Sequence, residues 1–286
     1  MANTALARVA AQPELDRIAK PLGDAVVAAY RNAGDVGMAV KNALHGVWLE
    51  HPLHPALTSI PLGAWTTTLA LDAKAAASGD ESYSRAADFT LAVGLAGAVG
   101  SAVTGLTDWS ETDGRAKRIG FIHGLLNVAA TAMMATAYVL RRRNERHSGQ
   151  ACTLAGFAVA SVSGYLGGDL VFGERIGVTH AVVDAPDDFK PVLASAALAE
   201  GSMQRVKDDF LVVRQHGRVC ALVHQCAHLG GPLSEGTLKD GTVVCPWHGS
   251  EFRLEDGSVV NGPSTHAQPC FETRDRDGQI EVGRTR

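Results

Sequence analysis

The length, composition and charge of the chain leave room for two domains and exclude several classes of protein. The 286 residues are 46% hydrophobic and 20% charged, enough apolar material for two cores. A net charge of -4 without any long basic run argues against a nucleic-acid partner. The five cysteines do not form the even, regularly spaced set of a disulfide framework, so we expect reducing surroundings.

Residues 1–50 are predicted to form an amphipathic helical segment. The run ELDRIAKPLGDAVVAAYRNAGDVGMAVKNALHGVW mixes apolar and charged residues, so the segment can lie on a membrane face. A soluble helical cap is the alternative. The opening residues MANTALARVAAQPELDR lack a basic start followed by an apolar core, so we expect no cleavable secretory signal.

Four apolar, weakly charged stretches follow, and they predict an all-α transmembrane four-helix domain over residues 51–180. Each is near the length that crosses a bilayer; they cover about residues 55–72, 88–108, 119–140 and 152–172. The third, IGFIHGLLNVAATAMMATAYVL, has no ionised group over 22 residues and stops at RRRNER, as a membrane span does. A soluble alanine-rich bundle is the alternative, favoured by the modest mean hydropathy of +0.03.

Polar residues that are costly in lipid stand at one end of these predicted spans. They are His45, His51, His54, Asp108, Trp109, Arg118 and His123. Because successive spans run in opposite directions, we expect these groups at one membrane face, the one that bears the C-terminal domain.

Two interpretations of this polar group remain open. In the first, the side chains cap helix ends and hydrogen-bond one another. In the second, they form a redox site: His54 and His123 are axial ligands of a non-covalent b-type haem, or hold a quinone head group together with Asp108 and Arg118.

The composition and hydrophobic pattern of the sequence change near residue 180. The stretch VDAPDDFKP indicates a linker, placed at 181–188, and the short alternating runs FLVVRQ, RVCALVH, TVVCPW and SVVNG predict strands separated by turns. We therefore expect an all-β domain over residues 189–286.

Two loops of this β domain carry a Cys-x-His pair and a Cys-x-x-His pair. Cys226 and His228 are followed, after a spacer of 16 residues, by Cys245 and His248. Four such side chains can hold a zinc ion or a two-iron cluster. A Cys-x-His pair without a following helix is unusual for a zinc finger, which favours the iron cluster.

The motif resembles that of the Rieske iron-sulfur family. The flanking sequences HLGGPL and CPWHGSEF, and the later NGPS, extend the resemblance over about residues 189–286. It implies a [2Fe-2S] cluster with Cys226 and Cys245 on the inner iron and His228 and His248 on the outer iron. Gly231 and Trp247 stand where quinol-oxidising members have two further cysteines, and Phe252 replaces a Tyr of high-potential members, which implies a potential in the lower part of the family's range.

A second resemblance covers about residues 40–180. The phrases HPLHP, GLTDW, RIGFIHGLLN and GYLGGDLV resemble a bacterial family of predicted four-helix membrane proteins. That family has no assigned chemistry, so the resemblance supports a membrane location and no activity.

The expected function is membrane-anchored one-electron transfer with redox proteins. A more specific hypothesis is that electrons are also exchanged with a quinone or haem at the helices. We expect no substrate-converting site of its own, because only some 30 residues follow CPWHGSEF, too few for the mononuclear iron domain of an oxygenase. An electron-transfer component of an oxygenase system and a redox sensor are the alternatives. The expected location is a bacterial inner membrane, with the β domain in the cytoplasm.

Overall fold

The computed structural model describes residues 8, 12–182 and 184–285, and these divide into two compact units. The helical unit contains the described residues up to Gly34 together with Leu53–Glu174, and the β unit contains Asp35–Pro52 and the described residues from Arg175 onward. The predicted segments 1–50, 181–188 and 189–286 include residues 1–7, 9–11, 183 and 286, which lie outside the described residues.

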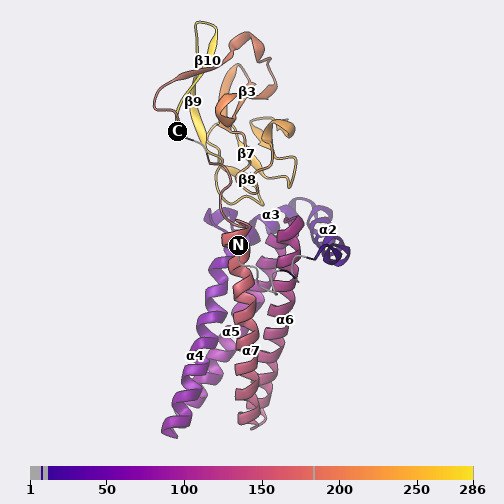
Figure 1. Ribbon diagram of the computed structural model, residues 1–286, viewed down its shortest axis with the longest axis vertical. Helices are drawn as coiled ribbons and strands as arrows, with labels where there is room; N and C mark the ends of the chain where they lie inside the picture. The colour runs from indigo at the N-terminus through magenta and orange to yellow at the C-terminus, as the bar shows by residue number, and fades with distance from the viewer. Residues whose placement is uncertain (1–7, 9–11, 183, 286) are drawn as a thin grey trace. The chain divides into compact units, whose positions relative to one another are not determined.

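The helical unit is built from long helices that run side by side (Figure 1). After the turn η1 (Pro13–Leu15), its helices are α2 (Asp16–Asn32), α4 (Leu53–Ser78), α5 (Glu81–Ser110), α6 (Gly114–Arg142) and α7 (Arg146–Gly168), which continues into the π-turn η3 (Asp169–Gly173). Helix α4 packs along α5, and α6 packs along α7. This arrangement agrees with the predicted four-helix bundle.

Small residues let the helices of the bundle approach closely. A Cβ on Gly94 of α5 would lie 2.2 Å from the indole nitrogen of Trp65 on α4, and one on Gly97 would lie 2.6 Å from Ile60. Side chains larger than hydrogen at these positions would force the helices apart, which is why helix contacts in lipid favour Gly and Ala.

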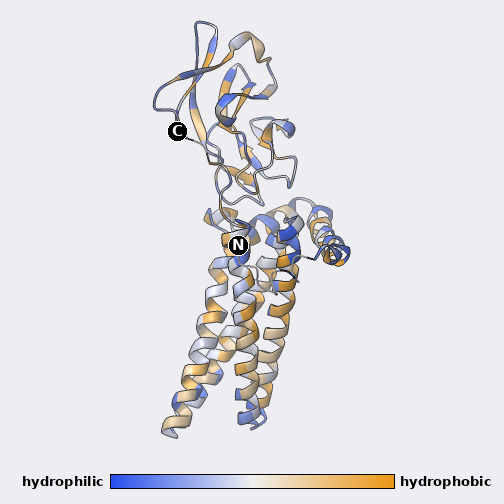
Figure 2. Cartoon of the chain, viewed as in Figure 1, coloured by the Kyte–Doolittle hydropathy of each residue, from blue (hydrophilic) through white to orange (hydrophobic). Residues whose placement is uncertain are grey.

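Among the described residues, three helices are long and apolar enough to cross a membrane: α5, α6 and α7 with η3. Helix α4 is not among them, because the threonines at 66–68 and the charges of Asp72 and Lys74 dilute its apolar residues. Large apolar side chains remain exposed on the bundle, such as Phe89, Val128 and Leu154, and in Figure 2 hydrophilic residues gather toward the helix ends. The predicted fold class, a helical membrane bundle followed by an all-β domain, is confirmed.

A buried network of charges joins α4, α5, α6 and α7. The guanidinium of Arg141 is fully buried and donates to Asp72 at 3.0 and 2.5 Å, to Asp88 at 3.1 Å and to Thr153 at 2.9 Å. Arg146 also donates to Asp88, at 3.2 Å. The sequence suggested that the arginines after the third apolar stretch stop a span at the membrane surface. Arg141 instead faces the bundle interior, where two carboxylates neutralise it.

The strands of the β unit form two antiparallel sheets in the described part of the chain. The six-stranded sheet has the order β1-β10-β9-β4-β3-β2, with β1 (Lys190–Ala194), β2 (Ser202–Arg205), β3 (Phe210–Gln215), β4 (Arg218–Val223), β9 (Cys270–Arg276) and β10 (Gln279–Thr285). The four-stranded sheet has the order β5-β6-β7-β8, with β5 (Thr237–Lys239), β6 (Thr242–Val244), β7 (Glu251–Arg253) and β8 (Val259–Asn261). One hydrophobic core, which includes Phe210, Phe252 and Phe271, serves both sheets.

The β unit also contains a helix from the N-terminal part of the chain. Helix α3 (Gly34–His45) and the turn η2 (Val47–Leu49) belong to it from Asp35 onward, whereas α2 belongs to the helical unit. The segment that the sequence presents as one amphipathic stretch is therefore shared between the two units.

Candidate metal centre

The two motif loops leave the strands of the β unit with the same backbone pattern. In the first loop, the carbonyl of Cys226 accepts from Gly230 N–H at 2.8 Å, and Cys226 N–H donates to Gly231 at 2.9 Å. The second loop repeats the two bonds at the same spacing, from Gly249 N–H to Cys245 at 3.1 Å and from Cys245 N–H to Ser250 at 2.8 Å. Gly230 and Gly249 have φ of 77° and 75°, a conformation that favours glycine. The glycines of the motif therefore close two equivalent loops.

The side chain of Gln268 holds the first loop in place through hydrogen bonds to the backbone. Its fully buried amide donates to the carbonyls of Val223 at 2.7 Å and Gln225 at 2.6 Å, and accepts from Ala227 N–H at 2.8 Å. These bonds join three backbone groups around the start of the loop and satisfy their hydrogen-bonding capacity. This role could not be predicted from the sequence, because a single glutamine some 40 residues after the loop belongs to no local pattern.

The two thiols of the motif meet at the base of the loops. Cys226 and Cys245 are buried and hydrogen-bond each other. This shared bond raises the pKa of Cys226 and lowers the pKa of Cys245 to about 6, so one of the pair ionises readily. Backbone N–H groups that favour the thiolate form come from His228, Leu229, Trp247 and His248. The pocket is therefore built to hold negative sulfur, as metal ligation requires.

The two imidazoles of the motif lie together beside the thiols. The ring centroids of His228 and His248 are 5.0 Å apart, and the rings are nearly perpendicular. The Nδ1 atom of His228 is buried and has no hydrogen-bond partner among the described residues. Burial, followed by the neighbouring His248, holds the pKa of His228 well below its usual value. A neutral imidazole with an unused ring nitrogen is the form that ligates a metal.

The donor set suits a centre with two irons. The motif residues form one thiol pair and one imidazole pair. A [2Fe-2S] cluster of mixed ligation needs two thiolates on one iron and two imidazoles on the other, so these residues suit such a cluster.

Gly231 provides a test of how tightly the site is packed. A Cβ at this position would lie 2.8 Å from the Cys245 sulfur and 3.1 Å from the Trp247 ring. We expect Gly231→Ala to destabilise the metal-loaded β unit by ~1–3 kcal/mol, the usual cost of overpacking. Thermal bleaching of the cluster absorbance measures this loss. The control is Gly164→Ala, where nothing lies within 4 Å; equal bleaching temperatures for the two variants would contradict the prediction.

The structure brings together only part of the predicted polar group of the helices. The rings of His54 and His123 meet edge to face, with centroids 6.4 Å apart. Each ring is hydrogen-bonded within the bundle: His54 Nδ1 donates to the Ser101 carbonyl at 2.9 Å and His123 Nδ1 to the Ser163 carbonyl at 2.8 Å. The second ring nitrogen of His123 accepts from the Asn127 amide at 3.0 Å.

The other members of this polar group have separate surroundings. Arg118 pairs with Asp16 of α2 at 3.1 Å, and Asp108 lies in the last turn of α5. His45 and His51 belong to the β unit, where the rings of His51 and His266 have centroids 5.8 Å apart. The ion pairs and hydrogen bonds favour the interpretation in which these side chains stabilise the helices.

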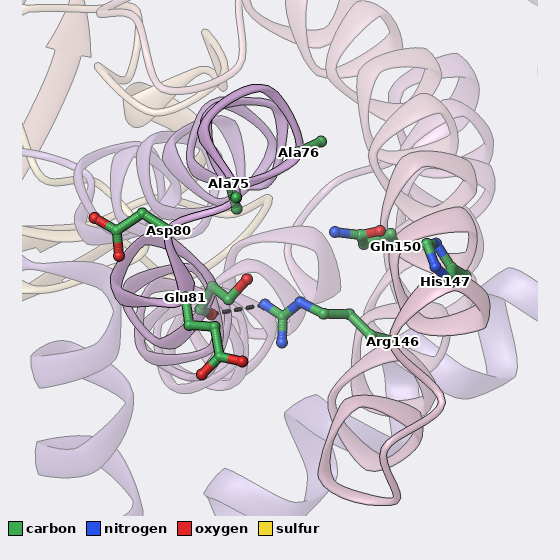
Figure 3. A pocket seen from close by; sticks show the side chains of 9 residues that line it. Ala75, Ala76, Asp80, Glu81, Arg146, His147 and Gln150 are labelled. Atoms are coloured by element: carbon green, nitrogen blue, oxygen red, sulfur yellow. Dashed lines mark hydrogen bonds between the residues drawn. The ribbon is translucent and has the colours of Figure 1, made fainter.

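A separate small cavity of about 190 Å³ lies between α4, α5 and α7 of the helical unit. Figure 3 shows Arg146 reaching across it, and its guanidinium donates to the Ser84 carbonyl at 2.7 Å. None of the lining residues is among those predicted to be functional. The arginine belongs to the same charge network as Arg141.

Two family models match the chain, one over most of the helical unit and the other within the β unit. The family described as predicted membrane protein (DUF2231) matches residues 50–180. The Rieske [2Fe-2S] domain matches residues 188–272. Neither the matches nor the relatives support a haem or a quinone in the helical unit.

Curated relatives match the Rieske part of the chain. Ferredoxin CarAc of Metapseudomonas resinovorans is 30% identical over 95 residues, which are 32% of this chain and 89% of the ferredoxin. The cytochrome bc1 complex Rieske iron-sulfur subunit of Streptomyces lividans is 34% identical over 86 residues, 29% of this chain and 51% of that subunit.

Human apoptosis-inducing factor 3 is 30% identical over 113 residues, which are 38% of this chain but only 19% of that protein. The chain thus spans about a fifth of the length of this much larger relative. The ferredoxin, in contrast, is matched over nearly its whole length. The chain therefore belongs to the Rieske [2Fe-2S] family, and its residues 50–180 match the family described as predicted membrane protein.

Proposed function

We propose that the protein is a membrane-anchored one-electron carrier in which Cys226, His228, Cys245 and His248 hold the [2Fe-2S] cluster. The observation that carries the proposal is the convergence of a thiol pair and an imidazole pair on two loops of equal backbone geometry. When bound, such a cluster accepts and releases one electron at a time.

The side chains of the site prepare it for this role. Backbone N–H groups aimed at the sulfurs of Cys226 and Cys245 stabilise the thiolate charge. Two imidazole ligands in place of two thiolates would give the site less negative charge than four thiolates, which makes an added electron less unfavourable. The fully buried Ser250 hydroxyl accepts from Ser264 N–H at 3.0 Å, which fixes the end of the second loop.

We propose redox proteins as the donor and the acceptor. The similarity to a ferredoxin and to a subunit of a cytochrome complex supports this class of partner. The apolar helices α5, α6 and α7 serve as the anchor in the lipid membrane. A bacterial inner membrane with the β unit on its cytoplasmic side is our proposal for the location. It is supported by the cysteines, none of which forms a disulfide in the described part of the chain, as suits a reducing compartment.

Rapid mixing of the purified full-length protein tests the function. The dithionite-reduced protein is mixed anaerobically with oxidised cytochrome c as a one-electron acceptor, and both chromophores are followed. We expect about one electron per chain to leave the cluster, as for a one-electron centre. Slow exchange with every protein carrier tried, in a cluster that dithionite reduces fully, would favour the redox sensor. Product formation from added aromatic substrates would favour the oxygenase system.

The histidines of the helices distinguish an anchor from a second redox site. We expect His54→Ala and His123→Ala to weaken the bundle by ~1 kcal/mol for each lost hydrogen bond. The rate of cluster reduction in membranes, per folded molecule, should stay at the wild-type value. Thr136→Ala, which removes one exposed hydroxyl of α6, is the control for general effects on the bundle. Slower reduction in both histidine variants, with an unchanged cluster spectrum, would favour a haem or quinone site at His54 and His123.

A further inference from the structure

Helix α3 is attached to the β unit by a specific pair of hydrogen bonds. The side-chain oxygen of Asn42 accepts from Gly262 N–H at 2.9 Å, and its amide nitrogen donates to the side-chain oxygen of Asn261 at 3.0 Å. Figure 1 shows α3 beside the loop that follows β8. A Cβ on Gly262 would lie 3.2 Å from the His45 ring and 3.3 Å from Val47, so the contact is close. Residues 35–52 lie outside the segment that matches the Rieske family.

The loop that holds α3 is bonded to the second motif loop. Asn261 donates to Glu251 at 2.8 Å, and Thr242 donates to the same carboxylate at 2.7 Å. Burial opposes the charge of Glu251, but these hydrogen bonds and Lys239 outweigh it and lower the pKa of this carboxyl. Glu251 directly follows Ser250, where the second loop ends. Asn42 is therefore linked to the metal centre through two side chains.

The inner face of α3 presents cationic and imidazole side chains to this region. Lys41 and His45 lie one helical turn apart and are only 6% and 1% exposed. Both lie close enough to interact electrostatically with the His228 ring, as does His180. His180 is attached to the first motif loop, because its backbone N–H donates to the Ala227 carbonyl at 3.0 Å.

We propose that α3 is a built-in cover on the histidine side of the cluster, and that Lys41 is an electrostatic tuning residue that raises its reduction potential. The inference rests on the proposed function, since it assumes a cluster on the motif residues. Reduction adds one negative charge to the cluster. A cation held by the fold, out of reach of bulk water and salt, favours the more negative state more strongly than a surface cation does.

A redox titration of the full-length protein, followed by electron paramagnetic resonance, tests the proposal. We expect Lys41→Met to shift the reduced-to-oxidised ratio at fixed ambient potential roughly tenfold toward oxidised, which is a fall of about 59 mV for a one-electron couple. Lys41→Arg keeps the charge and should stay close to wild type. Lys190→Met removes an exposed lysine from β1 and should leave the potential unchanged. Asn42→Ala, which releases the attachment of α3, should lower the potential in the same direction.

The outcomes separate the tuning role from the proposed function. An unchanged potential in Lys41→Met, with a wild-type spectrum, would overturn the inference and leave the cluster assignment intact. No cluster signal in the wild type would overturn the proposed function itself. If Lys41→Met does not load a cluster, Lys41→Gln replaces it. Loss of the cluster in both, with normal loading of Lys41→Arg, would show that Lys41 holds the loops and would overturn the tuning role.

Discussion

Replacing Cys245 by alanine should remove the iron-sulfur cluster while the chain still inserts in the membrane. Cys245 supplies the thiol that ionises most readily in the pair, with a pKa lowered to about 6 by its bond to Cys226. Without it the inner iron would lose one of its two protein ligands. Iron and acid-labile sulfide per chain should fall to background, and the same holds for Cys226→Ala.

Cys270→Ala is the matched control for this loss. Cys270 is also a buried cysteine of the β unit, but it lies on β9 outside both motif loops, so its loss should leave iron and sulfide unchanged. His248→Cys completes the series: a third thiolate adds negative charge, so any cluster that forms should have a lower potential. A normal cluster content in Cys245→Ala would contradict the ligand assignment.

Replacing Arg141 by methionine should destabilise the helical unit by ~3–5 kcal/mol, the usual cost of removing one partner of a buried ion pair. The guanidinium is fully buried and bonds Asp72, Asp88 and Thr153. Methionine fills similar volume but leaves the carboxylate of Asp72 without its bidentate partner. Unfolding of the detergent-solubilised protein, followed by circular dichroism, measures the change.

The neighbouring arginine and a double variant control this prediction. Arg142 is exposed, so Arg142→Met should change the free energy of unfolding by less than ~0.5 kcal/mol. Asp72→Asn together with Arg141→Met should recover part of the loss, because the buried negative charge is then removed as well. Equal stabilities of Arg141→Met and Arg142→Met would show that the network contributes nothing.

The two motif loops and the residues they carry could be predicted from the sequence because the motif is local. Each loop carries its cysteine and histidine within four residues, and the glycines that close the loop stand beside them. The alternation of apolar residues in the flanking runs then indicated strands, which places such loops at the ends of a sheet.

The cover by α3 could not be predicted in the same way. The bond between Asn42 and Gly262 joins residues 220 positions apart, and neither residue stands in a pattern that names its partner. Sequence order also suggested that residues up to 50 act together, whereas α2 and α3 belong to different units. Long-range polar contacts of this kind depend on the tertiary fold and leave no periodic signal.

The role of Arg141 was hidden for a related reason. An arginine after a long apolar run is typical of a span that ends at the membrane surface. The same residue can also face the bundle interior when a neighbouring helix offers a carboxylate as its ion-pair partner. Asp72, 69 positions earlier, supplies that carboxylate. The presence of Asp72 in an apolar stretch was visible, but its partner was not.

Pulsed electron paramagnetic resonance of the reduced full-length protein, combined with iron and sulfide analysis, tests the central claim most directly. The claim predicts two irons and two labile sulfides per chain, as in a [2Fe-2S] centre, with nitrogen couplings from His228 and His248 in the spectrum. His248→Cys should remove one of the two couplings. Stoichiometric zinc without labile sulfide, or a cluster spectrum without nitrogen couplings, would contradict the claim.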